Sequence, residues 1–475
     1  MLKRLATLLL LVAIAFPASA QQDLTSIDLS TLDAFRPAAG NWQLAGDLKV
    51  DRATDRHLES RQGTGILVNL PAVGARNNLF SAMEHGDIEL HLEFLMPKGS
   101  NSGVYLQGRY EIQLFDSWNK PNPSFDDAGG IYQRWDDTRE GAARGYEGHA
   151  PRMNVSRAPG LWQSLEIHFQ APRFDAEGRK TANARFDKVV HNGVVIHENV
   201  QLTGPTRAAA FQDEAALAPL MIQGDHGPVA LRNIQYRTYE PPPPPETEPR
   251  YVPAIFVEPG AQPEEIRGFV EHEGVKKTRT IAVGDPTGVH YVFDSEQGAL
   301  IKVWKGDFIE TTDMWHSRGT AQLAVPRGSV IDLSGAPSVA LLETPNTAWP
   351  DSATADYVFQ GYDLDETGHP TFRYRVGALH VEDHLAPGGN GQMLIRDLKI
   401  EGGTQTTAWV RVITASSIAS LTDGSFDIGG RTLYLDLLDS QGREPIIRDG
   451  ADGKELLVPV TVQDGPATVR YALIW

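Results

Sequence analysis

The sequence predicts an all-β protein made of two β-sandwich domains, and three observations lead to this prediction. Short segments with alternating apolar and polar residues occur in both halves of the chain, as expected for strands with one buried face. Turn-forming residues separate these segments at short spacing. Five consecutive prolines at 241–245 divide the 475 residues into two parts of ordinary domain size.

The first 20 residues have the composition of a secretory signal. Lys3 and Arg4 precede an apolar run that ends at Phe16, and the small residues 18–20 form a cleavage site. This run is too short to span a membrane. The chain has no cysteine, which suits a bacterial periplasm or exterior better than a eukaryotic secretory pathway. We therefore expect a periplasmic or secreted protein that is soluble after cleavage and is not inserted in a membrane.

The formal net charge of -18 argues against nucleic acid as a partner, because nucleic acids bind basic surfaces. The hydrophobic content of 41% and the charged content of 22% are those of an ordinary globular protein. We expect four regions in the chain: a signal peptide at 1–20, a first sandwich at 24–238, a proline-rich linker at 239–250 and a second sandwich of unknown role at 251–475.

The individual strands follow from local patterns. Residues 87–94 alternate strictly, with Ile88, Leu90, Leu92 and Phe94 directed to a core. Asn192-Gly193 predicts a tight hairpin, since both residues tolerate positive φ angles. Only residues 208–218 resemble a helix. Further strands are expected at 65–70, 163–170, 184–191, 194–198 and 220–223 in the first half, and at 288–294 and 298–308 in the second.

Residues 101–116 predict two short strands with an unusual polar face. The apolar side chains of Val104, Leu106, Ile112 and Leu114 point one way. The opposite face carries Tyr105, Gln107, Glu111 and Gln113. Amides and carboxylates bridge sugar hydroxyls, and an aromatic ring covers the apolar side of a pyranose. We therefore predict that this face binds a sugar.

Ten motifs follow one another in order across the first half. They are Asn77-Asn-Leu-Phe80, 86–94, 101–116, Gly130-Ile-Tyr132, 154–163, 171–175, His191-Asn-Gly193, Gly204-Pro-Thr206, Gln223-Gly-Asp-His226 and Arg232-Asn-Ile234. Through these motifs, residues 77–236 resemble the 3-keto-disaccharide hydrolase family. The resemblance implies a concanavalin-like jelly roll with a sugar cleft on its concave sheet. It also implies action on glycosides whose third hydroxyl has already been oxidised to a ketone.

The chain departs from that family between Arg134 and Arg152. A longer charged insertion with Trp135, Arg139, Tyr146 and His149 replaces a short passage there. Loops over a cleft are where substrate preference changes, so we expect the insertion to affect the leaving group.

The second half resembles, more loosely, β-sandwich domains attached to exported haem-binding and sugar-dehydrogenase proteins. The resemblance rests on 281–294, 303–308, 315–319 and 370–374. The chain has no Cys-x-x-Cys-His motif, so no c-type haem is expected on it.

Cleavage of a 3-keto-glycoside has its own chemical requirements. The ketone acidifies the neighbouring C2–H, and the resulting enolate expels the oxygen at C1, after which water adds back. This route needs a base near C2, an electrophile at the ketone oxygen and a proton donor for the leaving group. It does not need the paired carboxylates of an ordinary glycosidase.

Three residues are the candidate catalytic groups. Glu111 is the first candidate, as a carboxylate that acts as general base; its alternative is a structural pairing with Arg109 or Arg232. His226 follows an apolar strand in a turn, and a capping role is an equal alternative. Arg232 is expected to polarise the ketone oxygen, or else to hold the last strand to Asp116.

A second group of residues is expected to bind substrate: Asn101, Gln107, Gln113, Tyr132, Trp162 and Gln223. For several of these a structural role is the alternative, as a core tryptophan or as cross-strand and turn hydrogen bonds. His91 and Glu93 lie two apart on one strand, a weak metal-ligand spacing, and a divalent cation as cofactor stays open.

We therefore expect an exported enzyme that acts on 3-keto-glycosides by C2 proton abstraction, elimination and hydration. A carbohydrate is its substrate, and a sugar 3-dehydrogenase is its expected functional partner. The alternative is a non-catalytic carbohydrate-binding protein, or an accessory partner of an exported sugar dehydrogenase.

Overall fold

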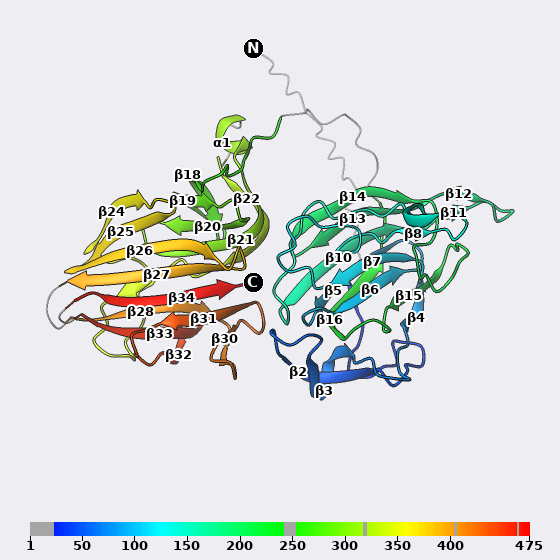
Figure 1. Cartoon of the computed structure of the whole chain (residues 1–475), viewed down its shortest axis with the longest axis horizontal. Helices are drawn as coiled ribbons and strands as arrows, with labels where there is room; N and C mark the ends of the chain where they lie inside the picture. The colour runs from blue at the N-terminus through cyan, green and yellow to red at the C-terminus, as the bar shows by residue number, and fades with distance from the viewer. Residues whose placement is uncertain (1–22, 242–252, 317–320, 403–405, 463–464) are drawn as a thin grey trace, which may run out of the picture.

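A computed structural model describes residues 23–241, 253–316, 321–402, 406–462 and 465–475. The expected signal peptide at 1–20 and most of the expected linker lie outside the described residues. The described residues are almost entirely strands, with one short α-helix, α1 (Thr312–His316), and one 3-10 turn, η1 (Gly141–Arg144). The predicted all-β fold class is confirmed (Figure 1). No described helix is long and apolar enough to cross a membrane.

The strands of the first half form two main antiparallel sheets. An eight-stranded sheet has the order β14-β13-β10-β5-β16-β3-β2, with β1 paired to β16, and a four-stranded sheet has the order β4-β15-β6-β7. The bounds are β1 Thr25–Ser26, β2 Trp42–Val50, β3 Leu58–Asn69, β4 Leu79–His85, β5 Ile88–Leu95, β6 Asn101–Leu106, β7 Tyr110–Phe115, β8 Arg134–Trp135, β9 Gly145–Tyr146, β10 Trp162–Gln170, β11 Arg173–Phe174, β12 Lys180–Ala182, β13 Ala184–His191, β14 Val194–Leu202, β15 Ala218–Ile222 and β16 Val229–Thr238.

The core of the first half lies between these two sheets. Strand β5 supplies the side chains that the alternation predicted, Ile88, Leu90, Leu92 and Phe94. Strands β6, β7 and β15 of the smaller sheet supply Val104, Leu106, Ile112, Leu114, Leu220 and Ile222 from the other side. The other side chains of each strand therefore lie on the two outer faces of the sandwich, because successive strand residues alternate.

The expected helix at 208–218 is wrong, because most of this segment is a loop that covers the β6–β7 hairpin. Ala208 has a φ of 62°, which a helix cannot contain. The Ala210 amide donates to the Gly108 carbonyl at 2.9 Å, and the Arg109 guanidinium lies 4.7 Å from the centre of the Phe211 ring. These tertiary contacts determine the conformation of the segment in place of its local helix propensity.

The strands of the second half form three sheets. They have the orders β17-β21-β20-β19-β18 with β22 on β21, β23-β28-β33-β32, and β24-β25-β26-β27-β34-β31-β30-β29. The bounds are β17 Phe256–Val257, β18 Glu264–His272, β19 Val275–Gly284, β20 Val289–Asp294, β21 Ala299–Glu310, β22 Val325–Asp332, β23 Val339–Ala340, β24 Tyr357–Leu364, β25 Pro370–Val376, β26 Leu379–Gly388, β27 Met393–Gly402, β28 Thr406–Ala415, β29 Ile418–Ser420, β30 Phe426–Ile428, β31 Leu433–Asp439, β32 Ile446–Gly450, β33 Gly453–Val462 and β34 Ala467–Ile474. The predicted hairpin of 288–294 and 298–308 is confirmed as β20 and β21.

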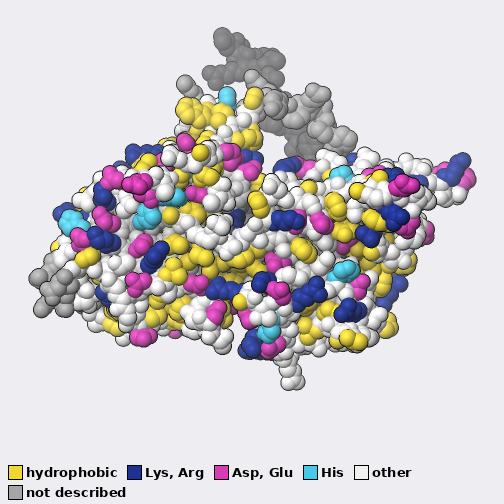
Figure 2. Space-filling view, viewed as in Figure 1, with side chains coloured by type: hydrophobic (Ala, Val, Ile, Leu, Met, Phe, Trp, Pro, Cys, Tyr) yellow, Lys and Arg dark blue, Asp and Glu magenta, His cyan; other side chains and the backbone are white. Residues whose placement is uncertain are grey.

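The two halves lie side by side and contact one another (Figure 1). Leu161 belongs to the main hydrophobic core of the second half. The Trp118 indole nitrogen donates to the Trp475 carbonyl at 3.0 Å, and the Arg52 guanidinium pairs with Asp436 at 2.8 Å. The surface drawn in Figure 2 carries acidic and basic side chains interspersed over both halves. The domain boundaries predicted above stay predictions.

Candidate active site on the four-stranded sheet

Glu111 lies on the outer face of the four-stranded sheet, as the alternation of β7 predicts. In the β6–β7 hairpin it is directly opposite Tyr105, and Gln113 is opposite Gly103. The Glu111 carboxyl extends over Gly103, where a Cβ atom would collide with its Oε1 atom. Glycine at position 103 therefore makes room for this carboxyl group. Glu111 is only 2% exposed, although it is outside the hydrophobic core.

The surroundings of Glu111 favour its protonated form. Burial raises the pKa of Glu111 to about 8, a hydrogen bond from the Tyr105 hydroxyl acts in the opposite direction, and the charge of Asp225 raises the pKa further. Burial also raises the pKa of Tyr105 well above its ordinary value. A carboxyl group of this kind holds a proton at neutral pH and can donate it, as a catalytic acid does.

Asp225 and His226 form a pair at the rim of the same face. The turn after β15 folds the Asp225 side chain back, so that Oδ1 lies 2.6 Å from His226 Nδ1. Both side chains are about half exposed. When Asp225 accepts the Nδ1 proton, His226 Nε2 keeps a free lone pair, the arrangement that orients a catalytic imidazole.

Three predicted substrate-binding residues, Tyr132, Gln223 and Gln113, lie around Glu111. The Tyr132 amide donates to the Glu111 carbonyl at 3.1 Å, and burial followed by the charge of Glu111 raises the pKa of Tyr132. The Gln223 amide donates to the Gly103 carbonyl at 2.9 Å. Gln113, opposite Gly103, donates its side-chain amide to the Asp126 carbonyl at 3.2 Å.

Two buried acceptors on the outer face of the four-stranded sheet have no hydrogen-bond partner within the described parts of the chain. They are the side-chain oxygens of Gln223 and Asn101. An unsatisfied buried acceptor costs free energy, so such groups mark a place where a ligand donates hydrogen bonds. Sugar hydroxyls are donors of this kind.

The insertion at 134–152 reaches the same face through Arg207. The Arg207 guanidinium stacks on the Trp135 ring at 3.8 Å. The Tyr105 hydroxyl oxygen also lies 3.4 Å from the Arg207 carbonyl oxygen, and the charge of the Arg207 guanidinium acts on Tyr132. The insertion therefore borders the site that contains Glu111.

Arg232 and Trp162 do not join this site. Both lie on the outer face of the eight-stranded sheet, so the hydrophobic core separates them from Glu111. The Arg232 guanidinium lies 4.1 Å from the Trp162 ring centre, and its Nε donates to Glu93 at 2.7 Å. The structural alternative for Arg232 named Asp116, but Glu93 is its partner. Trp162 packs in a second apolar cluster with Leu95.

Gln107 is not on the polar face of a strand, in contrast to the expectation. It lies in the hairpin turn with a φ of 53°, which directs its side chain away from the strand pattern. Its side-chain amide donates to the carbonyls of His85 and Ala216, at 3.1 and 3.0 Å. We therefore assign Gln107 a role in holding the hairpin.

His91 and Glu93 do not share a centre. His91 contacts Glu89 at 2.8 Å, and Glu93 is occupied by Arg232. The described residues contain no group of three or more His, Asp or Glu side chains arranged to hold a metal ion. Arg109 pairs with Asp213 at 2.8 Å, so it is not the partner of Glu111.

Gly103 and Arg207 were not expected in the site, and Asp225 was expected to point away from His226 unless its turn folded it back, which it does. The register of the hairpin could have identified Gly103, because a glycine two residues before Tyr105 on the same face leaves space above the sheet. The contact of Arg207 depends on how distant segments fold together, and the contact of Asp225 depends on the conformation of its own turn.

The first half of the chain is similar to a known protein family. A comparison with curated protein sequences found no match. Two solved structures from Parabacteroides distasonis ATCC 8503, described as candidate glycosyl hydrolases, are 20% and 17% identical to the chain. They cover 48% and 46% of it, and the aligned regions span 95% and 100% of those proteins, each with a TM-score of 0.31. Residues 27–237 match the family described as the 3-keto-alpha-glucoside-1,2-lyase-like domain. This match confirms the resemblance of the first sandwich to the 3-keto-disaccharide hydrolase family.

Proposed function

We propose that the first sandwich cleaves 3-keto-glycosides by elimination across C1 and C2. The family supports a glycoside-cleaving enzyme in general terms. The observation that supports the finer proposal is the buried, protonated Glu111 beside the Asp225–His226 pair on one sheet face. These groups supply the base and the proton donor that the route needs, whereas Arg232, which was expected at the ketone oxygen, lies across the core.

In the proposed reaction, His226 Nε2 takes the proton from C2, which the ketone at C3 has made acidic. The C2–H electron pair forms the C1–C2 double bond, and the C1–O bond breaks towards the leaving group. Glu111 gives its proton to the departing oxygen. This role differs from the general base expected from the sequence, because a carboxyl group with a pKa of about 8 is protonated at neutral pH.

The remaining groups position the sugar. The unpartnered oxygens of Asn101 and Gln223 accept hydrogen bonds from sugar hydroxyls. Tyr132 lies beside Glu111. Addition of water to C1 of the unsaturated product completes a net hydrolysis. The Glu111 carboxylate left after the first step is then a base that takes a proton from this water as its oxygen bonds to C1, and protonated His226 returns the proton to C2, which restores both groups.

The cellular setting belongs to the same proposal. The pattern of residues 1–20 supports export to the periplasm or the exterior. The ketone at C3 has to be introduced by an oxidation, so a sugar 3-dehydrogenase supplies the substrate in our proposal.

The test measures release of a chromogenic leaving group from a 3-keto-glucoside by the full chain. Glu111→Gln keeps the shape but has no proton to donate at the required acidity, so we expect a loss of about 10²–10⁴-fold. Glu93→Gln, on the opposite face of the sandwich, is the control and keeps activity. If Glu93→Gln lost activity and Glu111→Gln kept it, the site would lie on the eight-stranded sheet instead. Addition of a chelator to the same assay decides whether a divalent cation takes part.

A further inference from the structure

A large polar cleft occurs in the second half of the chain, away from the site described above. Its volume is about 1240 Å³, and its walls come from the ends of β18 and β22, the loop at 333–336 and strands β28, β32 and β33. Small-molecule sites in proteins have volumes of about 300–1000 Å³. This cleft therefore has room for a ligand of several rings.

The floor of the cleft is a buried network of charged groups. Glu455 is 2% exposed and accepts hydrogen bonds from Arg411 at 2.9 Å and from Arg448 at 2.7 Å. Arg411 also donates to the Ser334 hydroxyl at 2.8 Å and lies 5.0 Å from the centre of the Trp349 ring. Donors and acceptors thus alternate along a rigid floor that ends against an aromatic ring.

Two buried groups at the cleft have no hydrogen-bond partner among the residues that the structure describes. His272 is 2% exposed, and neither of its ring nitrogens forms a hydrogen bond. Its Nδ1 lies 3.5 Å from Asp332, which is too long for a well-formed hydrogen bond. The Thr414 hydroxyl is also unpartnered. Buried groups left in this state are satisfied by a ligand or by water.

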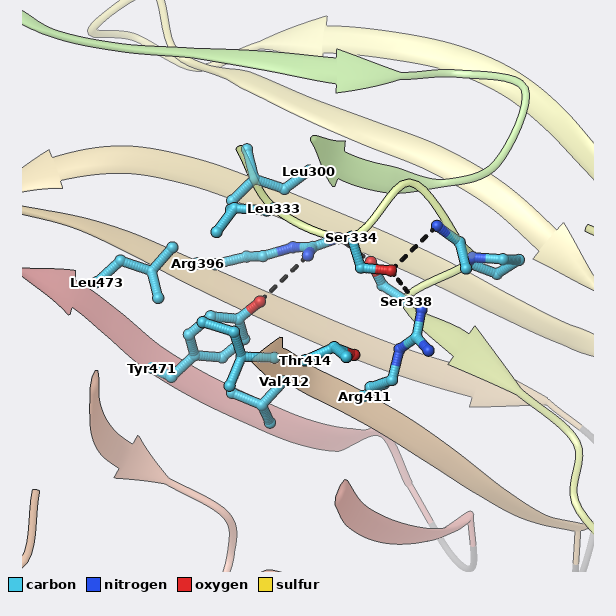
Figure 3. A pocket seen from close by; sticks show the side chains of 13 residues that line it. Leu300, Leu333, Ser334, Ser338, Arg396, Arg411, Val412, Thr414, Tyr471 and Leu473 are labelled. Carbon is cyan, nitrogen blue, oxygen red and sulfur yellow. Dashed lines mark hydrogen bonds between the residues drawn. The ribbon is translucent and has the colours of Figure 1, made fainter. Parts of the chain in front are cut away.

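A small cavity of about 30 Å³ lies directly behind the floor and shares Ser334, Arg411 and Thr414 with the cleft (Figure 3). Arg396 enters this cavity from the other side and donates to the Tyr471 hydroxyl at 3.1 Å (Figure 3). A polar cavity of this size holds a water molecule. The floor is therefore supported from behind by polar contacts and does not collapse into an apolar core.

The charges around the cleft restrict the kind of ligand. Asp351, Asp449 and Asp452 are exposed at its edge; Lys454 pairs with Asp449 at 2.6 Å and Lys277 also lines the cleft, so the edge keeps a smaller acidic excess that disfavours anionic ligands. The charged floor disfavours an apolar ligand, because its groups would lose hydration without new partners. A neutral ligand that both donates and accepts hydrogen bonds fits the floor and the edge, and sugar hydroxyls do both.

We propose that this cleft is a second carbohydrate site that binds a neutral oligosaccharide. The site does not depend on the cleavage chemistry proposed for the first sandwich. It would hold a longer glycan on the protein while the first sandwich acts on a terminal unit.

The test uses the full chain and calorimetric titration with neutral tetrasaccharides of glucose, galactose, mannose and xylose. Ala348 is exposed and lines the cleft, so Ala348→Trp fills the cleft without changing a buried group. Ala419→Trp adds the same ring at an exposed position elsewhere and is the matched control. Thermal unfolding of each variant checks that the fold is kept.

We expect the affinity for at least one neutral tetrasaccharide to fall 10-fold or more in Ala348→Trp and to stay unchanged in Ala419→Trp. Thr414→Val removes the unpartnered hydroxyl without changing the shape and weakens the same binding 3-fold or more. Equal affinities in all variants, or binding of only an acidic tetragalacturonate, would overturn the proposal. Turnover of a short 3-keto-glucoside is measured in parallel and stays normal in Ala348→Trp. The titration therefore tests the cleft, and the turnover assay tests the site of the first sandwich.

Discussion

The raised pKa of Glu111 predicts a pH-dependent stability that Glu111→Gln removes. The pKa rises from 4.5 to about 8 in the folded protein, and each pKa unit corresponds to about 1.4 kcal/mol. Ionising Glu111 in place therefore costs about 5 kcal/mol. Stability from the proton on Glu111 is fully present below pH 4.5, where the unfolded chain is also protonated. It is lost as the pH rises through about 8, because the unfolded chain ionises first.

About 4 kcal/mol of this loss falls between pH 5 and pH 9. Urea unfolding of wild type and Glu111→Gln at pH 5, 7 and 9 gives the free energy of unfolding of each protein. The loss is the change with pH in the difference between these two free energies. Glutamine does not titrate, so the variant gains about 4 kcal/mol relative to wild type over this range. Glu84→Gln, at an exposed glutamate of the same sandwich, is the control and shows no such gain. If wild type and Glu111→Gln differ in free energy of unfolding by the same amount at pH 5 and pH 9, burial does not raise the pKa of Glu111.

Four further predictions follow from the same geometry. Gly103→Ala displaces the Glu111 carboxyl and lowers kcat on a 3-keto-glucoside about 10²-fold, while circular dichroism shows an unchanged fold. His226→Asn keeps the pairing with Asp225 but removes the base, so steady-state rates fall about 10²–10⁴-fold. A fall of less than 3-fold would exclude His226 as the catalytic base. Trp135→Ala raises KM for substrates with a large leaving group and leaves a small leaving group unaffected, which paired kinetics would show. The fragment 24–238 folds cooperatively, with a Tm below that of the same region in the whole chain, because Leu161 no longer packs against the core of the second half. Calorimetry of the fragment and of the whole chain checks this.

The features that depend on local alternation could be predicted from the sequence. The core side chains of β5 and the outward position of Glu111 follow from the two-residue period of a strand. The β20–β21 hairpin follows from its turn residues. In each case, the residues that determine the structure are neighbours in the chain.

The features that depend on the pairing of distant strands could not be predicted. Arg232 and Trp162 were expected beside Glu111, but β16 and β10 belong to the eight-stranded sheet, which places them across the core. The contact between Asp225 and His226 depends on a turn that folds a side chain back. The irregular segment at 208–218 is held by the hairpin that it covers, which local helix propensity does not reveal.

The most direct test of the proposed elimination compares two substrates that differ only at C3. Release of the same leaving group is measured from a glucoside and from its 3-keto-glucoside, with the same full-length protein. We expect release only from the 3-keto-glucoside, because without the ketone the charge left at C2 has no carbonyl to stabilise it. Comparable rates on both would contradict the elimination and indicate a conventional glycosidase, whose transition state needs no ketone. No release from either would contradict catalysis altogether and leave a carbohydrate-binding protein.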